Sequence, residues 1–177
     1  MVQEVLSYCI FKTKWGYFGL AGSDTALLRS CLPGTREAVQ EQLLRGLSGA
    51  RQRRDYFSDL QERIVAYFDG ALVAFGPEIT IDLGALGEFS RRVLDACRAI
   101  DFGQTRAYSD LARVVGRPGA SRVVGHALAS NPVPLIIPCH RVVQSDGGLG
   151  GFTAPGGVAI KRRFLNHEQI CLRRVGV

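Results

Sequence analysis

The sequence predicts two units, an α/β N-terminal unit followed by a mainly helical second unit. Short apolar segments separated by turn residues come first, as strands require, and apolar residues at helical spacing dominate the remainder. A length of 177 residues is enough for one substantial domain or two small ones with adequate cores. A stretch containing Gly76 and Pro77 separates the two patterns, so we expect units at 1–84 and 85–177.

The first unit reads as a strand-rich segment followed by helices. Strands are expected over 4–11, 16–21 and 26–32, where apolar residues lie between turn residues. Pro33-Gly34-Thr35 then opens a helix, and an amphipathic helix over 57–68 ends at Asp69-Gly70. A short extended segment is expected over 79–81, just before the boundary.

The second unit reads as a series of helices. Its first helix is predicted by apolar residues at helical spacing, namely Phe89, Val93, Leu94, Cys97 and Ile100, which makes Cys97 a core residue. A turn over 102–105 ends that helix. Helices over 108–115 and 120–129 then follow, joined by the glycine-bearing turn at 116–119. Two short helices joined in this way have the outline of a helix-turn-helix.

The helix over 120–129 has two unlike faces. At about 100° per residue, one side is predicted to pack inward with Val123, Val124, Ala127 and Leu128. The other side carries Arg122, Gly125, His126 and Ala129. One long cation among small residues would let the backbone approach a groove closely, whereas a solvated arginine on a surface helix is the plainer alternative.

The excess of positive over negative charge lies entirely in the second half of the chain. The formal net charge is +6, but residues 1–82 hold nine Lys and Arg against ten Asp and Glu. Residues 83–177 hold thirteen against six. Clustered arginine and lysine gain from neutralising phosphates, so the asymmetry indicates a polyanion as partner.

Cysteine usage argues against a disulfide framework and against a tetrahedral zinc site. The five cysteines are scattered, no CxxC pair occurs, and no histidine precedes His126. Reduced thiols in a reducing compartment fit this pattern. No secretion signal and no membrane-length apolar run is recognisable, so we expect an intracellular protein, cytoplasmic if prokaryotic, with no membrane partner and no metal.

The most informative segment is the proline-punctuated run at 131–143, in which Cys139 stands between Pro138 and His140. Prolines fix backbone angles and remove amide donors, which suits a rigid, non-helical turn. Cysteine is a strong nucleophile only as the thiolate, and a neighbouring histidine and Arg141 favour that form. The sequence around Cys139 therefore permits two readings, a reactive nucleophile or a small core hydrophobe.

The stretch from Phe89 to Glu168 resembles the O6-alkylguanine-DNA alkyltransferases, also called methylated-DNA–protein-cysteine methyltransferases. The active-site signature of that family matches Pro138-Cys139-His140-Arg141-Val142. Further matches occur in the same order at 103–108, 122–125, Asn131-Pro132, 148–152, Lys161 and 165–168. The N-terminal unit is similar to the small domain of the family only at Trp15-Gly16 and 20–22.

The resemblance implies a fold and a reaction. The N-terminal sheet would be ribonuclease H-like, and the helix-turn-helix would be winged-helix-like. Cys139 would accept an alkyl group permanently from O6-alkylguanine in DNA, with activity on O4-alkylthymine left open. His140 would take the thiol proton through a bound water, and Glu168 would orient the imidazole.

The resemblance also assigns residues to DNA and substrate. Arg122 would fill the space left by the extruded guanine, and Tyr108 would assist extrusion and protonate the leaving guanine. Asn131 would brace the turn before the cysteine. Further DNA contacts are expected from Ser121, Val123 and Gly125, and substrate contacts from Val142, Thr153, Phe152 and Arg141. The partner would be double-stranded DNA containing alkylated bases, bound through its minor groove by a monomer without cofactor, with cooperative binding left open.

Departures from the family pattern affect the specificity for alkyl groups. The sequence also permits two other functions. Phe152 stands where tyrosine is frequent, and His126 replaces a glycine or arginine, so the range of accepted alkyl groups is left open. An alkyltransferase-like protein that only binds damaged DNA is one alternative, although such relatives replace the cysteine that is present here. A helix-turn-helix regulator with a structural cysteine is the other, and it leaves His140 and Glu168 unexplained.

Overall fold

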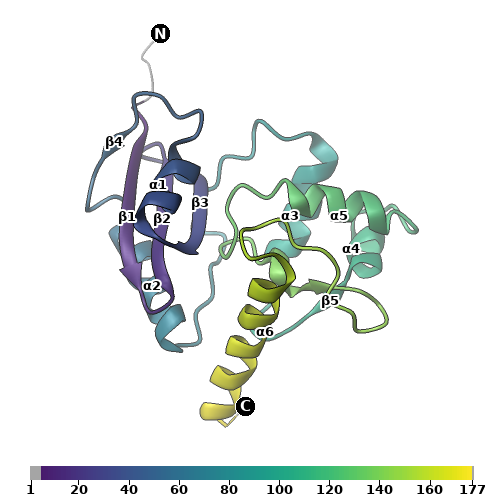
Figure 1. The fold of residues 1–177 in the computed structure, drawn as a ribbon. Coiled ribbons are helices and arrows are strands. Elements are labelled where there is room, and N and C mark those ends of the chain that lie inside the picture. Colours follow the sequence, from purple (N-terminus) through teal and green to yellow (C-terminus); the bar gives the residue numbers. More distant parts are fainter. Residues whose placement is uncertain (1–4, 177) are drawn as a thin grey trace. The chain divides into compact units, whose positions relative to one another are not determined.

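The computed structural model describes residues 5–176, which divide into two compact units. One unit comprises residues up to Val73 together with Pro77–Leu83, and the other comprises Ala74–Gly76 and the chain from Gly84 onward. The expected coarse architecture, a sheet with helices followed by a helical part, is the one observed (Figure 1).

The first unit is built on a four-stranded sheet. Strands β1 (Ser7–Thr13), β2 (Gly16–Gly22) and β3 (Leu27–Gly34) form an antiparallel meander, and β4 (Arg51–Gln52) pairs in parallel with β1. The sheet order is β3-β2-β1-β4. The three long strands confirm the predicted ones with shifted ends, while Glu4 lies outside the described residues. The sequence reading missed β4, because two exposed polar residues carry no strand pattern.

Helices α1 (Arg36–Leu44) and α2 (Ser58–Asp69) cover opposite faces of this sheet (Figure 1). Val39 and Leu43 of α1 pack on Tyr8, Ala21 and Cys31. On the other face the rings of Phe18 and Phe68 are 6.1 Å apart. Thr35 caps α1 by accepting from the N–H of Ala38, and Gly70 ends α2 in the left-handed conformation, as the sequence predicts. The extended segment expected over 79–81 is reduced to one bridge between Ile81 and Leu27.

The second unit is mainly helical. Its elements are α3 (Glu88–Arg98), β5 (Arg106–Ala107), α4 (Tyr108–Val114), α5 (Ser121–Ala129), a 3₁₀ turn η1 (Cys139–Arg141), β6 (Val142–Val143) and α6 (Gly157–Arg174). The predicted helices at 108–115 and 120–129 are confirmed to within one residue. Strands β5 and β6 pair in parallel and bring the start of α4 beside the end of η1.

The buried face of α5 is narrower than predicted. Val124, Ala127 and Leu128 are buried, but Val123 is 48% exposed, so its assignment to the packing face is wrong. The buried arc is centred near Val124, and Val123 lies about 90° from that centre. Cys97 of α3 is fully buried, as expected.

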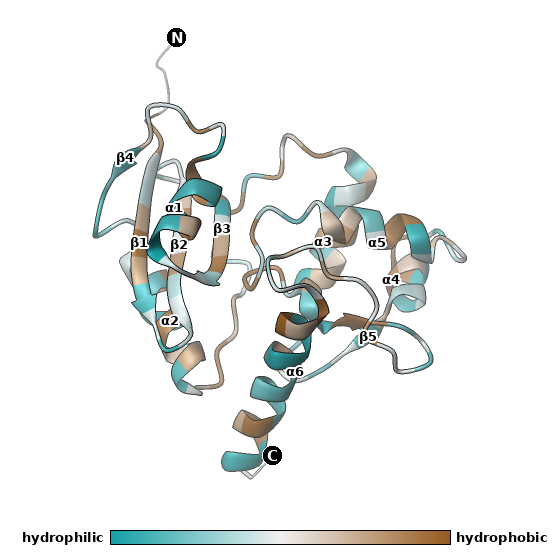
Figure 2. Cartoon of the chain, viewed as in Figure 1, coloured by the Kyte–Doolittle hydropathy of each residue, from teal (hydrophilic) through white to brown (hydrophobic). Residues whose placement is uncertain are grey.

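Helix α6 turns an unusual face inward. Its buried residues are Lys161, Phe164, Glu168 and Cys171, so two of the four carry charge. Figure 2 shows the corresponding mixture of hydrophilic and hydrophobic residues along this helix. Burying a charge is costly unless it is paired or hydrogen-bonded, so this face must meet polar partners.

Candidate active site

A tight backbone turn sets the position of Cys139. Pro138 has φ −83° and ψ 62°, and the N–H of Cys139 donates to the carbonyl of Ile137 at 2.8 Å. These values describe an inverse γ-turn. Leu135 has a φ of 77°, which bulky residues rarely adopt, and it is almost wholly buried. The approach to the cysteine is therefore a rigid, non-helical path, as the prolines predict.

Asn131 holds this turn and contacts the sulfur. Its Nδ2 donates to the carbonyl of Ile137 at 2.9 Å and to Cys139 Sγ at 3.3 Å. Its Oδ1 accepts from the N–H of Val133 at 3.0 Å. One amide side chain thus fixes the backbone before the cysteine and offers a donor to the thiol. A donor at this position favours the thiolate.

Glu168 and His140 form a buried pair. His140 Nε2 lies 2.8 Å from Glu168 Oε1, and both side chains are at least 98% buried. Because Glu168 accepts hydrogen bonds here, the neutral imidazole carries its proton on Nε2 and keeps Nδ1 as an acceptor. Burial lowers the pKa of His140, against the opposing effect of the carboxylate. The imidazole is therefore neutral at rest and able to take a proton.

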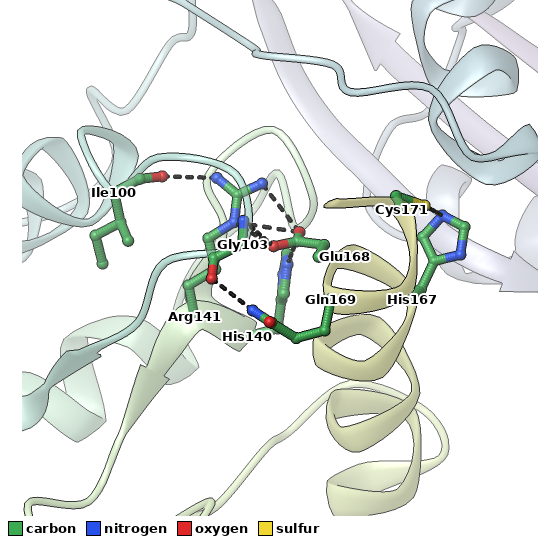
Figure 3. Close-up of polar contacts among 8 residues, drawn as sticks. All are labelled: Ile100, Gly103, His140, Arg141, His167, Glu168, Gln169 and Cys171. Atoms are coloured by element: carbon green, nitrogen blue, oxygen red, sulfur yellow. Dashed lines mark hydrogen bonds and ion pairs between the residues drawn. The ribbon is translucent and has the colours of Figure 1, made fainter. Parts of the chain in front are cut away.

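Several donors converge on the Glu168 carboxylate (Figure 3). Besides His140, Arg141 Nη2 donates to Oε1 at 2.9 Å, and the N–H of Gly103 donates to Oε2 at 2.8 Å. Burial alone would raise the pKa of this carboxyl, but the hydrogen bonds and charges of His140 and Arg141 outweigh it and lower the pKa to about 2. Glu168 is consequently a fixed anion at neutral pH.

Arg141 contacts the carboxylate of Glu168 and a backbone carbonyl. Its Nη1 donates to the carbonyl of Ile100 at 2.6 Å, its Nε and Nη2 donate to Glu168, and its side chain is 7% exposed. The guanidinium is thus occupied by partners within the protein. Such an arginine can position Glu168, and its expected contact with the substrate stays a prediction.

A buried lysine lies beside Tyr108. Lys161 has no exposed surface, and its Nζ donates to the hydroxyl of Tyr108 at 3.3 Å and to the carbonyl of Gly151 at 3.4 Å. Its ammonium also lies 5.9 Å from the centre of the Phe152 ring. Burial lowers the pKa of Lys161 to about 8. The Lys161 ammonium can therefore lose its proton near neutral pH, and it contacts the Tyr108 hydroxyl, which is expected to act on the substrate.

Burial dominates the acidity of the Cys139 thiol and raises its pKa. The hydrogen bond from Asn131 and the charge of Lys161 act in the opposite direction. The thiol is therefore neutral at rest, and a base must remove its proton before it can act as a nucleophile. All five cysteines are free thiols, and burial raises the pKa of each of the other four as well.

The outward face of α5 connects with Tyr108. Arg122, Val123 and His126 are exposed, while Ser121 and Gly125 are half-buried. A Cβ added at Gly125 would lie 3.8 Å from the Tyr108 ring, so the ring packs against this helix. Arg122 and Gly125 therefore lie on the outward side of α5, which borders a candidate catalytic side chain, and Ser121 and Val123 lie toward its two edges.

The remaining candidates lie on β6 and on the loop before α6. Val142 is buried, and its N–H donates to the carbonyl of Cys139. Thr153 is exposed, and its Oγ1 donates to the carbonyl of Ala129 at 3.4 Å. Phe152 is half-buried over Lys161. The structure thus attaches this loop both to the end of α5 and to Lys161.

Among residues 5–176, no group of three or more His, Cys, Asp or Glu side chains is arranged to hold a metal ion. Within the same residues, no helix has the length and apolarity needed to cross a bilayer.

The second unit matches a known protein family. Residues 88–170 match the family described as 6-O-methylguanine DNA methyltransferase, DNA binding domain. A methylated-DNA–protein-cysteine methyltransferase from Mycolicibacterium paratuberculosis is 33% identical over 165 residues, covering 93% of each chain. The chain belongs to the methylated-DNA–protein-cysteine methyltransferase family. The resemblance of the Pro138–Val142 segment and its companion motifs is thereby confirmed.

Other relatives and solved structures extend this assignment over both units. A methyltransferase of the same name from Methanosarcina acetivorans is 36% identical over 164 residues, covering 93% of this chain and 99% of its own. A crystal structure titled as Mycobacterium tuberculosis OGT in complex with DNA superposes with a TM-score of 0.77 at 30% identity, covering 93% of this chain and 94% of that one. The methyltransferase fold therefore includes the N-terminal sheet, which the motifs alone barely indicated.

Sequence reasoning on this methyltransferase missed two contributors to the site. The sequence shows Lys161 only as part of a matching motif, and it gives no indication of a role for the N–H of Gly103. The spacing of Lys161, Phe164 and Glu168 places all three on one face of a helix, so the apolar Phe164 was the available signal for burial of both charges. A backbone donor such as Gly103 leaves no such trace in sequence.

Proposed function

We propose that this protein repairs DNA by transferring the alkyl group of O6-alkylguanine to Cys139 in a single, irreversible turnover. The observation that carries the proposal is Cys139 itself, held by Asn131 and followed directly by the His140–Glu168 pair in a member of the methyltransferase family. A protein that only recognised damage would not need a thiol placed beside a neutral imidazole and a fixed carboxylate.

The chemistry follows from the protonation states of these groups. His140 accepts the thiol proton through a bound water, and the carboxylate of Glu168 stabilises the imidazolium that forms. The Cys139 thiolate then attacks the alkyl carbon, so that an S–C bond forms as the C–O bond breaks. The electron pair stays on the guanine, which takes a proton from the hydroxyl of Tyr108.

Lys161 completes this proton balance. Loss of a proton leaves Tyr108 as a phenolate, and the Lys161 ammonium already donates to that oxygen. Burial raises the pKa of Tyr108, whereas that of Lys161 is lowered to about 8, so proton transfer from lysine to phenolate is downhill. The product is an S-alkylcysteine, whose thioether is a poor leaving group, and each molecule therefore acts once.

The DNA is bound by the outward face of α5 in the minor groove, where readout is degenerate and lesions are reached in any sequence. Arg122 occupies the space of the extruded guanine, and Ser121, Val123 and Gly125 lie against the backbone and groove. Val142, Phe152 and Thr153 surround the extruded base, which must leave the stack because its alkylated oxygen is otherwise inaccessible. We propose a monomer acting inside the cell.

Finer features of the fold form part of the same proposal. A three-stranded antiparallel meander whose first strand also pairs in parallel with a later strand is consistent with a ribonuclease H-like sheet. The helices α4 and α5 and the tight turn at 144–148 after β6 are consistent with a helix-turn-helix of winged-helix type. In this arrangement the residues up to 84 support the transferase unit.

Mass spectrometry tests the reaction directly. The full-length protein is incubated with a duplex carrying one O6-methylguanine, and its intact and peptide masses are taken. We expect a single methyl increment on the Cys139 peptide, limited to one per molecule, and none in Cys139→Ser. An unmodified mass with lesion-selective binding would favour a damage-recognition protein, and neither modification nor lesion preference would favour a DNA-binding regulator.

Methyl-transfer rates of variants test the DNA face separately. Arg122→Ala is expected to slow methyl transfer from duplex DNA strongly, because extrusion of the base is no longer supported. Arg36→Ala, which alters an exposed arginine on α1 of the first unit, is the matched control. Equal transfer rates for the two variants would refute the role of Arg122.

A further inference from the structure

The turn that joins α3 to β5 is fastened to α6 through both polar groups of one residue. The N–H of Gly103 donates to Glu168 Oε2 at 2.8 Å, and the carbonyl of Gly103 accepts from Gln169 Nε2 at 2.7 Å (Figure 3). Two consecutive residues of α6 therefore hold the backbone of Gly103 from its two sides. One of those residues, Glu168, carries the carboxylate that contacts His140.

Steric contact makes this attachment specific to glycine. Gly103 has a φ of 73°, a conformation that side-chain-bearing residues rarely adopt. A Cβ at this position would lie 2.2 Å from Leu172 Cδ1, closer than any real contact. The turn thus lies directly against α6, and a small rotation of its peptide groups would change the donor offered to Glu168.

The same turn is tied to the rest of the site on both sides. Before it, the carbonyl of Ile100 accepts from Arg141 at 2.6 Å. After it, β5 pairs with β6, the strand that follows Cys139-His140-Arg141, and leads directly into Tyr108. The segment from Ile100 to Gly103 is therefore a common support for the Glu168 anion and for the start of α4.

We propose that Gln169 is a positioning residue for alkyl transfer, which holds the Gly103 carbonyl so that the Gly103 N–H stays on Glu168 and the carboxylate keeps His140 oriented. This role rests on the proposed function, since it acts on the same His140–Glu168 pair. Gln169 does not touch the substrate. It is an exposed polar residue of α6, and the sequence alone predicts no role for such a residue.

Loss of the Gln169 donor should raise the pKa of His140 and lower the transfer rate at neutral pH. Without it the peptide group that joins Gly103 to Gln104 keeps only the hydrogen bond from the Gln104 N–H to the carbonyl of Asp101. The glycine between the two peptide groups can then rotate, and the hydrogen bond from the Gly103 N–H to the Glu168 carboxylate weakens. A less satisfied carboxylate holds a proton on the neighbouring imidazole more strongly, so the pKa of His140 rises. Because His140 must be neutral to accept the thiol proton, the acid limb of the rate profile moves to higher pH and the rate at neutral pH falls.

The size of the effect is set by one hydrogen bond. We expect a decrease of about two- to tenfold in the transfer rate, the range that a single intramolecular hydrogen bond spans. Because Gln169 is exposed, the thermal midpoint should change little. DNA affinity should not change, since α5 is not altered.

The experiment compares three variants of the full-length protein. Gln169→Leu removes the donor at similar size, Gln169→Lys restores a donor to the Gly103 carbonyl, and Ile170→Ala alters the adjacent exposed side chain. Single-turnover methyl transfer from an O6-methylguanine duplex is measured across pH 5 to 9, together with DNA affinity. Hydrogen–deuterium exchange of the peptide covering 100–108 reports on the Gly103 N–H independently of activity.

The proposal predicts faster exchange, a slower rate and a shifted acid limb for Gln169→Leu, recovery in Gln169→Lys, and wild-type behaviour in Ile170→Ala. Unchanged exchange in Gln169→Leu would overturn it, and so would faster exchange with an unchanged rate profile. If the wild type itself transfers no methyl group, the proposed function fails while the exchange result still decides whether Gln169 holds the turn.

Discussion

Lys161 Nζ lies 3.3 Å from the hydroxyl of Tyr108, and the Lys161 side chain is completely buried. A lysine without solvent contact loses its hydration and must gain from specific partners. Its partners here are the Tyr108 oxygen and the carbonyl of Gly151, and its charge lowers the pKa of the Cys139 thiol. One buried cation therefore acts both on the proposed nucleophile and on the proposed proton donor.

Replacing Lys161 should uncouple activity from stability. In Lys161→Met the aliphatic stem is kept and the charge is lost, so the pKa of Cys139 rises and the Tyr108 phenolate loses its proton source. We expect the single-turnover rate to fall by about tenfold or more. Urea unfolding should show no loss of stability, because a buried charge is replaced by an apolar group. A wild-type transfer rate would contradict the assigned role of Lys161.

The loop glycines provide a matched steric test at Tyr108. A Cβ at Gly150 would lie 2.8 Å from the Tyr108 ring and hydroxyl, and Gly150 has a φ of 69°. A Cβ at Gly151 would meet nothing within 4 Å. Gly150→Ala should therefore displace Tyr108 and slow transfer at least about tenfold, while Gly151→Ala keeps the wild-type rate. Both are compared by single-turnover assay, and equal rates would show that the position of Tyr108 is unimportant.

Asn131 should control the acidity of the thiol. Asn131→Asp has nearly the same shape but cannot donate to Cys139 Sγ, and its negative charge opposes the thiolate. The pH at which Cys139 reacts with iodoacetamide should therefore move upward, as followed by the mass of the Cys139 peptide. Cys139→Ser supplies the background of the assay. An unchanged pH dependence in Asn131→Asp would mean that the Asn131 hydrogen bond does not affect the thiol.

The buried Glu168 network should make the protein sensitive to acid. The pKa of Glu168 is lowered from 4.5 to about 2, so the unfolded chain binds more protons than the native one and stability is lost as the pH falls through that interval. The lowered pKa of His140 acts in the same direction from about pH 6.5 downward. Urea midpoints measured from pH 7 to pH 3 should fall throughout this range.

Glu168→Gln tests the origin of that acid sensitivity. At pH 7 it leaves the buried Arg141 charge unpaired and should cost about 3–5 kcal/mol. The difference from wild type should shrink toward pH 3, because the carboxyl of Glu168 in the unfolded wild-type chain then takes up a proton that the native carboxylate does not. Glu62→Gln on α2, where the side chain is exposed, should follow the wild-type curve. A constant difference between Glu168→Gln and wild type at all pH values would exclude Glu168 as the titrating group.

Much of the second unit could be predicted because the relevant signals are local. Apolar spacing located α3, α4 and α5, and the prolines around Cys139 predicted its rigid turn. The prediction failed where a residue lies at the edge of a helix face, as for Val123. The burial of such a residue depends on which elements pack against the helix. The helical period gives only the angular position of the side chain around the helix axis.

The amino-acid sequence alone predicts Cys139 as the nucleophile and identifies its immediate neighbours, because Pro138, Cys139 and His140 are joined by the backbone and their relative placement is nearly fixed. The partners of the buried charges depend on the folding of distant elements onto one another. Glu168 is separated from His140 by 28 positions and Lys161 from Tyr108 by 53, so packing of α6 brings each pair together. A charged side chain costs free energy when buried unless such a partner exists, and the identity of that partner depends on how distant elements fold onto one another.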